Sequence, residues 1–326
     1  MLGRTGRPVS VIGLGCWQLG GDWGAVSEDD AMAVLHAAVD AGVTLLDTAD
    51  VYGDGRSEQL IGRFLVDNPG VDITVATKMG RRMEQVPENY TLENFRVWAD
   101  RSRRNLNTDQ LDLVQLHCPP TSVYSSDAVY DALDTLVADG VVASYGVSVE
   151  TADEALTAIS RRGTATVQII LNAFRLKPLE FVLPAAEAAG VGIIARVPLA
   201  SGLLSGKYTA DTQFAENDHR NYNCDGSAFD VGETFAGVDY ETGVQAAVEF
   251  AKLVDQLPGD VTPAQAALAW VVQQPGVTTV IPGARSVEQA QSNAAAGSLP
   301  ALGDDFLTAV QDLYDRSIRA SVHDRW

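Results

Sequence analysis

The chain is poor in cysteine, in lysine and histidine, and in long apolar runs. Its cysteines, Cys16, Cys118 and Cys224, are widely spaced and odd in number. They form neither a disulfide framework nor a CxxC motif, so we expect a reducing compartment and no metal site. No apolar stretch is long enough to cross a bilayer. The N-terminal residues 1–10 are polar and lack the apolar core of a signal peptide, so we expect a cytoplasmic protein.

Basic residues are also scarce relative to acidic ones. The 326 residues include 23 Lys and Arg against 43 Asp and Glu, which gives a formal net charge of −20. This balance disfavours nucleic acid and anionic membranes as partners. The negative charge fits a well-solvated surface, with salt adaptation as the alternative. An anionic ligand would need a locally positive pocket.

Short apolar runs alternate with amphipathic segments along the whole chain. We expect strands over residues 7–14, 43–47, 73–78, 111–117, 143–148, 166–171, 191–197 and 277–281. We expect helices over residues 27–42, 57–66, 91–106, 128–138, 152–161 and 178–189, and from Thr262 onward. This alternation favours an α/β fold with a single (β/α)8 barrel over residues 1–326 that begins with an N-terminal strand or hairpin. A doubly wound open sheet is the competing architecture.

One segment, residues 209–240, breaks the alternation. It has no clear period, and it contains Phe214, Tyr222, Phe229, Phe235 and Tyr240. Loops of this length are usually functional or disordered. Because it follows the seventh strand, we expect a flap at the carboxyl rim of the barrel, with a surface insertion as the alternative.

Two glycine-rich segments look like phosphate-binding motifs but depart from them. In residues 13–18, Gln18 takes the place of the third glycine of a dinucleotide fingerprint, and a loop is expected to follow. In residues 201–208, Ser201 and Tyr208 replace two residues that a P-loop requires. We therefore expect neither a Rossmann site nor ATP hydrolysis.

Four polar residues lie at or just after predicted strand ends: Asp47, Tyr52, Lys78 and His117. A parallel barrel presents the carboxyl ends of all its strands at one rim. An ammonium group lowers the pKa of a neighbouring phenol, and a carboxylate holds the ammonium in place. An imidazole can orient a carbonyl oxygen. Each residue alone has ordinary structural roles, but together they predict a proton relay for carbonyl reduction.

At this point the chain resembles the aldo-keto reductases. The matching segments are DTADVYG at 47–53, ATK at 76–78, LDLVQLH at 111–117, GVS at 146–148, PLASGLLSGKY at 198–208 and IPGAR at 281–285. The resemblance extends from about Arg7 to Asn293. It is greatest for the bacterial and potassium-channel-β-subunit-like branch.

The resemblance implies a role for each matching residue. Tyr52 would donate the proton, Lys78 and Asp47 would tune it, and His117 would orient the carbonyl. The cofactor would be NADP, with NAD as a possible substitute. The cofactor contacts would be Ser148, Gln168, Arg196, Leu199, Ser201, Leu203, Lys207, Gly283, Arg285, Gln289 and Asn293.

Three positions depart from the family pattern. Val149 stands where an asparagine usually follows the serine, and Arg196 replaces an aromatic that often stacks on the nicotinamide. Gln289 occupies the place of the arginine that often binds the 2′-phosphate of NADP, so Arg285 is the candidate replacement. Ser286 and Gln289 also read as a capping box, which would place a helix N-terminus near the phosphate.

The sequence says less about the residues that would bind the substrate. Trp17 and Trp23 follow the first strand, and with the flap they could line an apolar pocket for an aldehyde, ketone or sugar carbonyl. Packing beneath the rim is the alternative for both. Two rival functions are a non-catalytic cofactor-binding regulatory subunit, resembling channel β subunits, and a barrel lyase or isomerase. The intact tetrad favours an NADP-dependent reductase.

Overall fold

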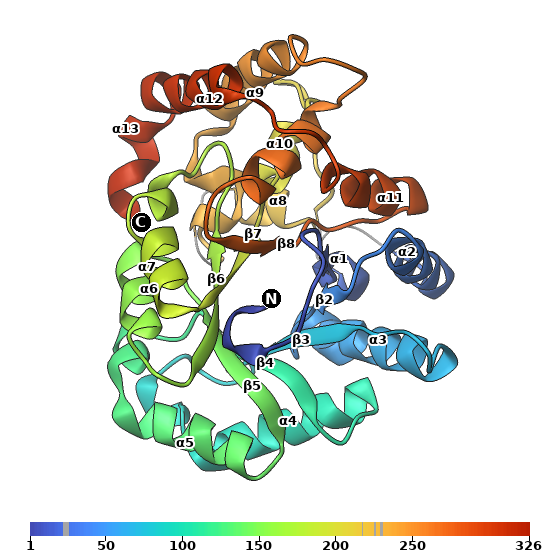
Figure 1. The fold of residues 1–326 in the computed structure, drawn as a ribbon, viewed down its shortest axis with the longest axis vertical. Coiled ribbons are helices and arrows are strands. Elements are labelled where there is room, and N and C mark those ends of the chain that lie inside the picture. The colour runs from blue at the N-terminus through green and yellow to red at the C-terminus, as the bar shows by residue number, and fades with distance from the viewer. Residues whose placement is uncertain (22–25, 217, 225, 229–230) are drawn as a thin grey trace.

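A computed structural model describes residues 1–21, 26–216, 218–224, 226–228 and 231–326. Within these residues, eight parallel strands form one sheet in chain order, ringed by helices (Figure 1). Parallel bridges join Ile12 to Val280 and Gly15 to Gly283, which connects the last strand to the first. The predicted (β/α)8 barrel is therefore confirmed, and the open sheet is excluded.

The strands are short and almost entirely buried, as expected for a parallel sheet covered by helices. They are β1 Leu14–Gly15, β2 Leu45–Asp47, β3 Thr74–Met79, β4 Leu111–His117, β5 Val142–Ser148, β6 Thr164–Ile170, β7 Gly192–Arg196 and β8 Val277–Val280. The predicted strand over residues 7–14 is largely wrong, because only its last residue belongs to β1. Next to it, Ser10 and Thr44 exchange hydrogen bonds of 2.7 and 2.9 Å between main chain and side chain, which replace a regular ladder.

The N-terminal segment folds into a short 3-10 helix, Gly3–Thr5, instead of a hairpin. Leu2 is fully buried inside the barrel and packs in a cluster with Leu45 and Ile194. Arg4 donates hydrogen bonds to main-chain carbonyl groups at the amino-terminal start of β6 and just before β7. The N-terminus thus closes the barrel at the amino ends of the strands, which leaves the carboxyl ends for a site.

Helices follow most strands on the outside of the barrel. They are α1 Trp17–Gly20, α2 Glu28–Asp40, α3 Arg56–Asp67, α4 Leu92–Leu106, α5 Asp127–Ala138, α6 Ala152–Ile159, α7 Val182–Ala189, α8 His219–Tyr222, α9 Tyr240–Val254, α10 Pro263–Val272, α11 Val287–Ala296, α12 Asp304–Ser317 and α13 Arg319–Val322. The capping box at Thr262 begins α10 as predicted. The sequence did not predict α1, α8, α9, α12 or α13, and the loop expected at Gln18 is instead the short helix α1. Of the helices described here, none is both long and apolar enough to cross a membrane.

The segment 209–240 contains more structure than the sequence suggested. It holds α8 and two short 3-10 helices, η7 Val231–Glu233 and η8 Phe235–Gly237. Its rings pack on one another, with centroid distances of 5.8 Å between Phe214 and Phe235 and 4.9 Å between Phe235 and Tyr240. Phe229 lies outside the described residues. We call residues 209–240 the rim segment.

Candidate active site

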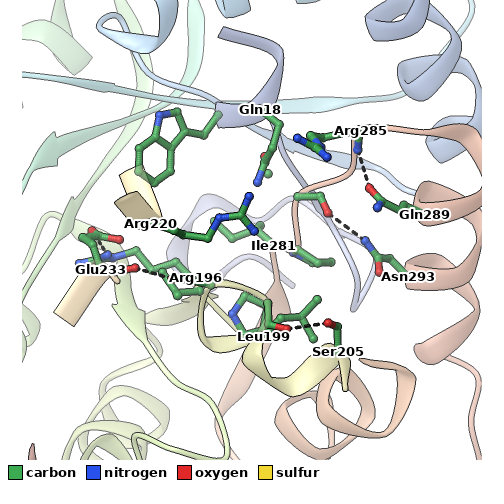
Figure 2. A pocket seen from close by; sticks show the side chains of 18 of the residues that line it. Gln18, Arg196, Leu199, Ser205, Arg220, Glu233, Ile281, Arg285, Gln289 and Asn293 are labelled. Carbon is green, nitrogen blue, oxygen red and sulfur yellow. Dashed lines mark hydrogen bonds and ion pairs between the residues drawn. The ribbon is translucent and has the colours of Figure 1, made fainter. Parts of the chain in front are cut away.

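A cavity of about 810 Å³ opens at the carboxyl ends of the strands, and Figure 2 shows part of its wall. Most predicted site residues line it: Trp17, Asp47, Tyr52, His117, Ser148, Gln168, Arg196, Leu199, Ser201, Lys207, Gly283, Arg285, Gln289 and Asn293. Lys78 and Leu203 are buried next to this lining. Trp23 lies outside the described residues.

The predicted tetrad comes together at one end of the cavity. β2 ends at Asp47, β3 carries Lys78 and β4 ends at His117, while Tyr52 begins the turn after β2. The Lys78 ammonium lies 2.5 Å from the Asp47 carboxylate and 3.3 Å from the Tyr52 hydroxyl. The rings of Tyr52 and His117 meet edge to face, with centroids 5.9 Å apart. A phenol, an ammonium, a carboxylate and an imidazole therefore share one small region.

Two glutamines fix the carboxylate of the tetrad. Gln168 donates to Asp47 Oδ2 over 2.7 Å, and Gln115 donates to the same oxygen over 3.3 Å. Since Lys78 takes the other oxygen, the buried carboxylate is bonded on both sides. Gln115 was not predicted as a site residue, although it stands on β4 within the LDLVQLH segment.

Burial and neighbouring charges have opposite effects on the pKa of Tyr52, and likewise on the pKa of Lys78. Burial raises the pKa of Tyr52 above its ordinary value, although the nearby Lys78 ammonium lowers it. The predicted net lowering is therefore not found, and the hydroxyl keeps its proton at neutral pH. Burial alone would lower the pKa of Lys78, but Asp47 and Tyr52 raise it, so the ammonium stays charged.

His117 is held as a neutral imidazole. Burial, followed by the charges of Arg81, Lys78 and Arg196, places the pKa of His117 well below its usual value. Among the described residues its Nδ1 atom is buried without a hydrogen-bond partner. Arg81 donates to the main-chain oxygen of His117 over 3.1 Å and so fixes its backbone. A neutral imidazole at this place can donate a hydrogen bond to a carbonyl oxygen without being an acid.

Trp17 covers the Tyr52 ring. The two rings stack with centroids 5.8 Å apart, and the ring of His219 from the rim segment lies 4.9 Å from Trp17. The rim segment therefore reaches Tyr52 through one aromatic side chain, Trp17. This position in the cavity wall agrees with the pocket role predicted for Trp17.

The cavity is more positive than the molecule around it. Its described lining carries five basic side chains, Arg81, Arg196, Lys207, Arg220 and Arg285, against the three acidic ones, Asp47, Glu233 and Glu288. The whole chain has the opposite balance, with 23 basic and 43 acidic residues. This is the locally positive pocket that an anionic ligand requires.

The end of the cavity near α11 is narrow at the backbone. The end of the Gln18 side chain lies against Gly283, only 2.1 Å from where a Cβ atom would stand, so a larger residue there would displace Gln18. Asn293 donates to the main-chain oxygen of Gly283 over 3.1 Å (Figure 2). Arg285 lies two residues further on, just before the N-cap of α11. A glycine cradle beside a cation and a helix N-terminus fits a phosphate-bearing dinucleotide.

The capping box predicted for Ser286 and Gln289 is wrong in one of its two hydrogen bonds. Ser286 caps α11 by accepting from the Gln289 amide, but the Gln289 side chain accepts from the Arg285 amide over 2.8 Å. The reciprocal bond of a capping box is therefore missing. The side chain of Gln289 instead holds the main chain of Arg285 at the cavity wall.

Two predicted cofactor residues have internal partners. The Ser201 hydroxyl donates to Glu233 O over 2.8 Å and accepts from the Phe235 amide over 3.1 Å, which joins the β7 loop to the rim segment. The Ser148 hydroxyl lies 3.2 Å from the sulfur of Cys118. Both residues still line the cavity.

Sequence reasoning missed several charged residues of the wall. One of them is Glu233 of the rim segment, which forms an ion pair with the predicted residue Arg196 (Figure 2). Arg196 also pairs with Glu150 over 3.1 Å. Arg220, also from the rim segment, projects into the cavity (Figure 2). It pairs with Asp218 over 2.5 Å. Because Glu233 and Arg220 stand outside the strands, no periodic pattern pointed to them.

The structure offers no metal centre in the residues it describes: no three His, Cys, Asp or Glu side chains gather in a way that could hold an ion. The three cysteines are free, with Cys16 and Cys118 buried and Cys224 exposed.

A barrel with this tetrad at its carboxyl rim is typical of one family of oxidoreductases, and comparison with known proteins agrees. The sequence model of the Aldo/keto reductase family matches residues 11–315, so the chain belongs to that family.

Its relatives include bacterial members. The glycerol dehydrogenase AKR11B4 from Gluconobacter oxydans is 30% identical, with a TM-score of 0.79 over 96% of this chain and 94% of that one. An aldo/keto reductase from Klebsiella pneumoniae, solved with NADP and acetate, is 25% identical, with a TM-score of 0.68 over 94% of this chain and 92% of that one. The uncharacterized oxidoreductase YqkF of Bacillus subtilis is 27% identical over 316 residues, covering 95% of this chain and 94% of its own length.

Proposed function

We propose that this protein is an NADPH-dependent reductase of aldehydes, ketones or sugar carbonyls, which also catalyses the reverse oxidation of the alcohols. The observation that carries the proposal is the Tyr52 hydroxyl, 3.3 Å from a buried, charged Lys78 at the end of a positive cavity. The NADP-bound relative from Klebsiella supports the choice of cofactor. The glycerol dehydrogenase relative supports a small hydroxylated compound as one substrate to test.

Each residue of the tetrad has a defined task in this proposal. When bound, the reduced nicotinamide supplies a hydride to the carbonyl carbon. His117 donates a hydrogen bond that orients the carbonyl oxygen, and Tyr52 gives its proton to that oxygen as negative charge develops there. Lys78 stabilises the resulting phenolate, and Asp47 keeps Lys78 charged and in place.

The cofactor would lie along the positive arm of the cavity. Arg285, beside the glycine cradle, would bind a 2′-phosphate, since a guanidinium can hold phosphate oxygens with two hydrogen bonds. Lys207 and Ser201 belong to the loop after β7 that would hold the pyrophosphate. Ser148 and Gln168 would approach the nicotinamide amide.

The proposal is tested by binding first and turnover second. NADPH and NADH are titrated separately by quenching of tryptophan fluorescence, and oxidation of the bound cofactor is then followed with glyceraldehyde, propanal and an aldose. We expect tighter binding of NADPH and turnover with at least one carbonyl compound. Binding without any turnover would favour the regulatory alternative, and failure to bind either dinucleotide would contradict both functions.

A further inference from the structure

The turn that carries Tyr52 has an unusual backbone. Gly53, Asp54 and Gly55 all have positive φ angles, of 59°, 53° and 95°. Asp54 is not a glycine, so this conformation is strained for it and needs support from the surroundings. Tyr52 is therefore placed by a turn that does not hold its shape through local preference alone.

Close packing supports the turn on one side. A Cβ atom added at Gly53 would lie 2.2 Å from the main-chain oxygen of Gly20, and one added at Gly20 would lie 2.5 Å from the carbonyl carbon of Tyr52. The end of α1 and the turn thus touch backbone to backbone. This contact limits movement toward α1 but leaves the opposite side to be held by other groups.

Two arginines hold that opposite side. Arg101 of α4 donates to the main-chain oxygen of Asp50 over 3.0 Å and to that of Asp54 over 2.6 Å. Its guanidinium also reaches the Asp54 carboxylate over 2.9 Å. Arg82 donates to Asp50 O over 3.3 Å and to the Asp54 carboxylate over 2.5 Å. The two carbonyl groups lie two residues before and two residues after Tyr52.

Arg82 and Arg101 stand on chain segments that connect the Tyr52 turn to the rest of the tetrad. Arg82 stands four residues after Lys78 on the same chain segment, and Arg101 stands on the helix that packs against α3. A surface ion pair with Asp54, whose side chain is 78% exposed, would contribute little by itself. The bonds to main-chain oxygens are different, because they fix the backbone on both sides of Tyr52.

We infer that Arg101, supported by Arg82, is a positioning residue that fixes the hydroxyl of Tyr52 relative to Lys78. The inference rests on the proposed role of Tyr52 as the proton donor. Small displacements of a reacting group have large kinetic costs, about 100-fold for 1 Å. Loss of the two main-chain bonds should therefore act on the proton transfer step and leave the distant cofactor arm unchanged.

A double-mutant cycle tests the inference. The variants are Arg101→Ala, Tyr52→Phe and their combination, with kcat measured in single turnover and the dissociation constant of NADPH measured by fluorescence. We expect Arg101→Ala to lower kcat about 10- to 100-fold and to change NADPH binding by less than about twofold. In the Tyr52→Phe background, Arg101→Ala should lower kcat by no more than about twofold, since there is no proton donor left to misplace.

Controls separate positioning from general stability. Arg96→Ala removes a half-exposed arginine of the same helix whose partner is Asp139, and it should leave kcat unchanged. Asp54→Asn keeps both main-chain bonds, so it should cost less than Arg101→Ala. If Arg101→Ala does not fold, Arg101→Lys takes its place. We expect Arg101→Lys to fold and its kcat to lie below the wild-type value by no more than about tenfold.

The outcomes distinguish the inference from the function on which it rests. Wild-type kcat in Arg101→Ala, or an equal fold-loss in the Tyr52→Phe background, overturns the positioning role alone. Wild-type kcat in Arg101→Lys does the same if the alanine variant is unfolded. Near-normal turnover of Tyr52→Phe itself overturns the proton-donor role, and the positioning role with it.

Discussion

The tetrad and the rim segment border the same cavity, but different forces hold them in place. Lys78, Asp47 and His117 stand on or at the ends of parallel strands that are fully paired inside the barrel. The rim segment reaches the cavity through ion pairs such as Glu233 with Arg196 and through the hydroxyl of Ser201. The barrel thus places the proposed chemistry, whereas side-chain pairs place the wall that covers it. Substitutions in the two regions should therefore change different quantities.

The largest fall in kcat is expected when the tetrad loses the positive charge of Lys78. Lys78→Met removes the ammonium that stabilises the Tyr52 phenolate, so kcat should fall about 100- to 10,000-fold. Steady-state kinetics on a variant with a native circular dichroism spectrum measures this. Lys252→Met, which alters an exposed lysine on α9, is the matched control and should be unchanged. A loss of less than about tenfold in Lys78→Met would contradict the proposed role.

The second effect concerns stability and comes from a buried acid next to the tetrad. Both carboxylate oxygens of Asp50 are buried without a hydrogen-bond partner among the described residues. Burial, followed by the charge of Glu58, raises the pKa of Asp50 from 3.8 to about 7. The folded state therefore keeps this proton up to about pH 7, whereas the unfolded chain releases it near pH 4. Stability contributed by this carboxyl is fully present below about pH 4 and is lost as the pH rises from there through about pH 7.

Asp50→Asn should remove that dependence, because an amide does not ionise. Between pH 5 and pH 8 the free energy of unfolding should fall less in the variant than in the wild type, by about 1 to 3 kcal/mol. Urea unfolding at the two pH values measures the difference. Parallel pH dependence in both proteins would show that Asp50 titrates normally in the folded state.

The third effect concerns the cofactor arm. Arg285→Ala should weaken NADPH binding about tenfold and spare NADH, because only NADPH carries the 2′-phosphate. Titrations at one fixed ionic strength give both dissociation constants. Arg162→Ala, on an exposed arginine far from the cavity, should alter neither. Equal losses for the two cofactors would refute a specific contact with the 2′-phosphate.

The smallest effect is expected in the rim segment. Glu233→Gln removes a negative charge from the wall of a cavity that is proposed to receive a polyanion, so NADPH should bind about threefold tighter. The chemical step should change little. Glu216→Gln, on an exposed residue of the same segment, is the control. Weaker binding of NADPH by Glu233→Gln would show that the ion pair with Arg196 supports the cofactor instead of competing with it.

The same comparison explains what could be predicted from the sequence. Apolar runs predicted most strands, and their carboxyl ends carried Asp47, Lys78 and His117 to one rim, because a parallel barrel leaves no other place for them. The strand over residues 7–14 was wrong because Ser10 and Thr44 bond through side chains, which no hydrophobic period reveals. Arg220 and Glu233 were missed because both belong to the rim segment, which has no hydrophobic period, and because the partner of Glu233, Arg196, lies 37 residues away in the sequence.

The pKa of Tyr52 shows a further limit. The proximity of Lys78 was predicted, and its effect on the pKa has the predicted sign, but burial outweighs it. The degree of burial depends on Trp17 and the rim segment together, so it follows from tertiary packing and not from the tetrad motif.

The turnover of Tyr52→Phe tests the central claim most directly, because this change removes one oxygen atom and leaves the stacked ring. With NADPH and a carbonyl substrate that the wild type reduces, kcat should fall about 100- to 10,000-fold while the dissociation constant of NADPH stays within about twofold. A variant that reduces the substrate at nearly the wild-type rate would contradict the assignment of Tyr52 as the proton donor.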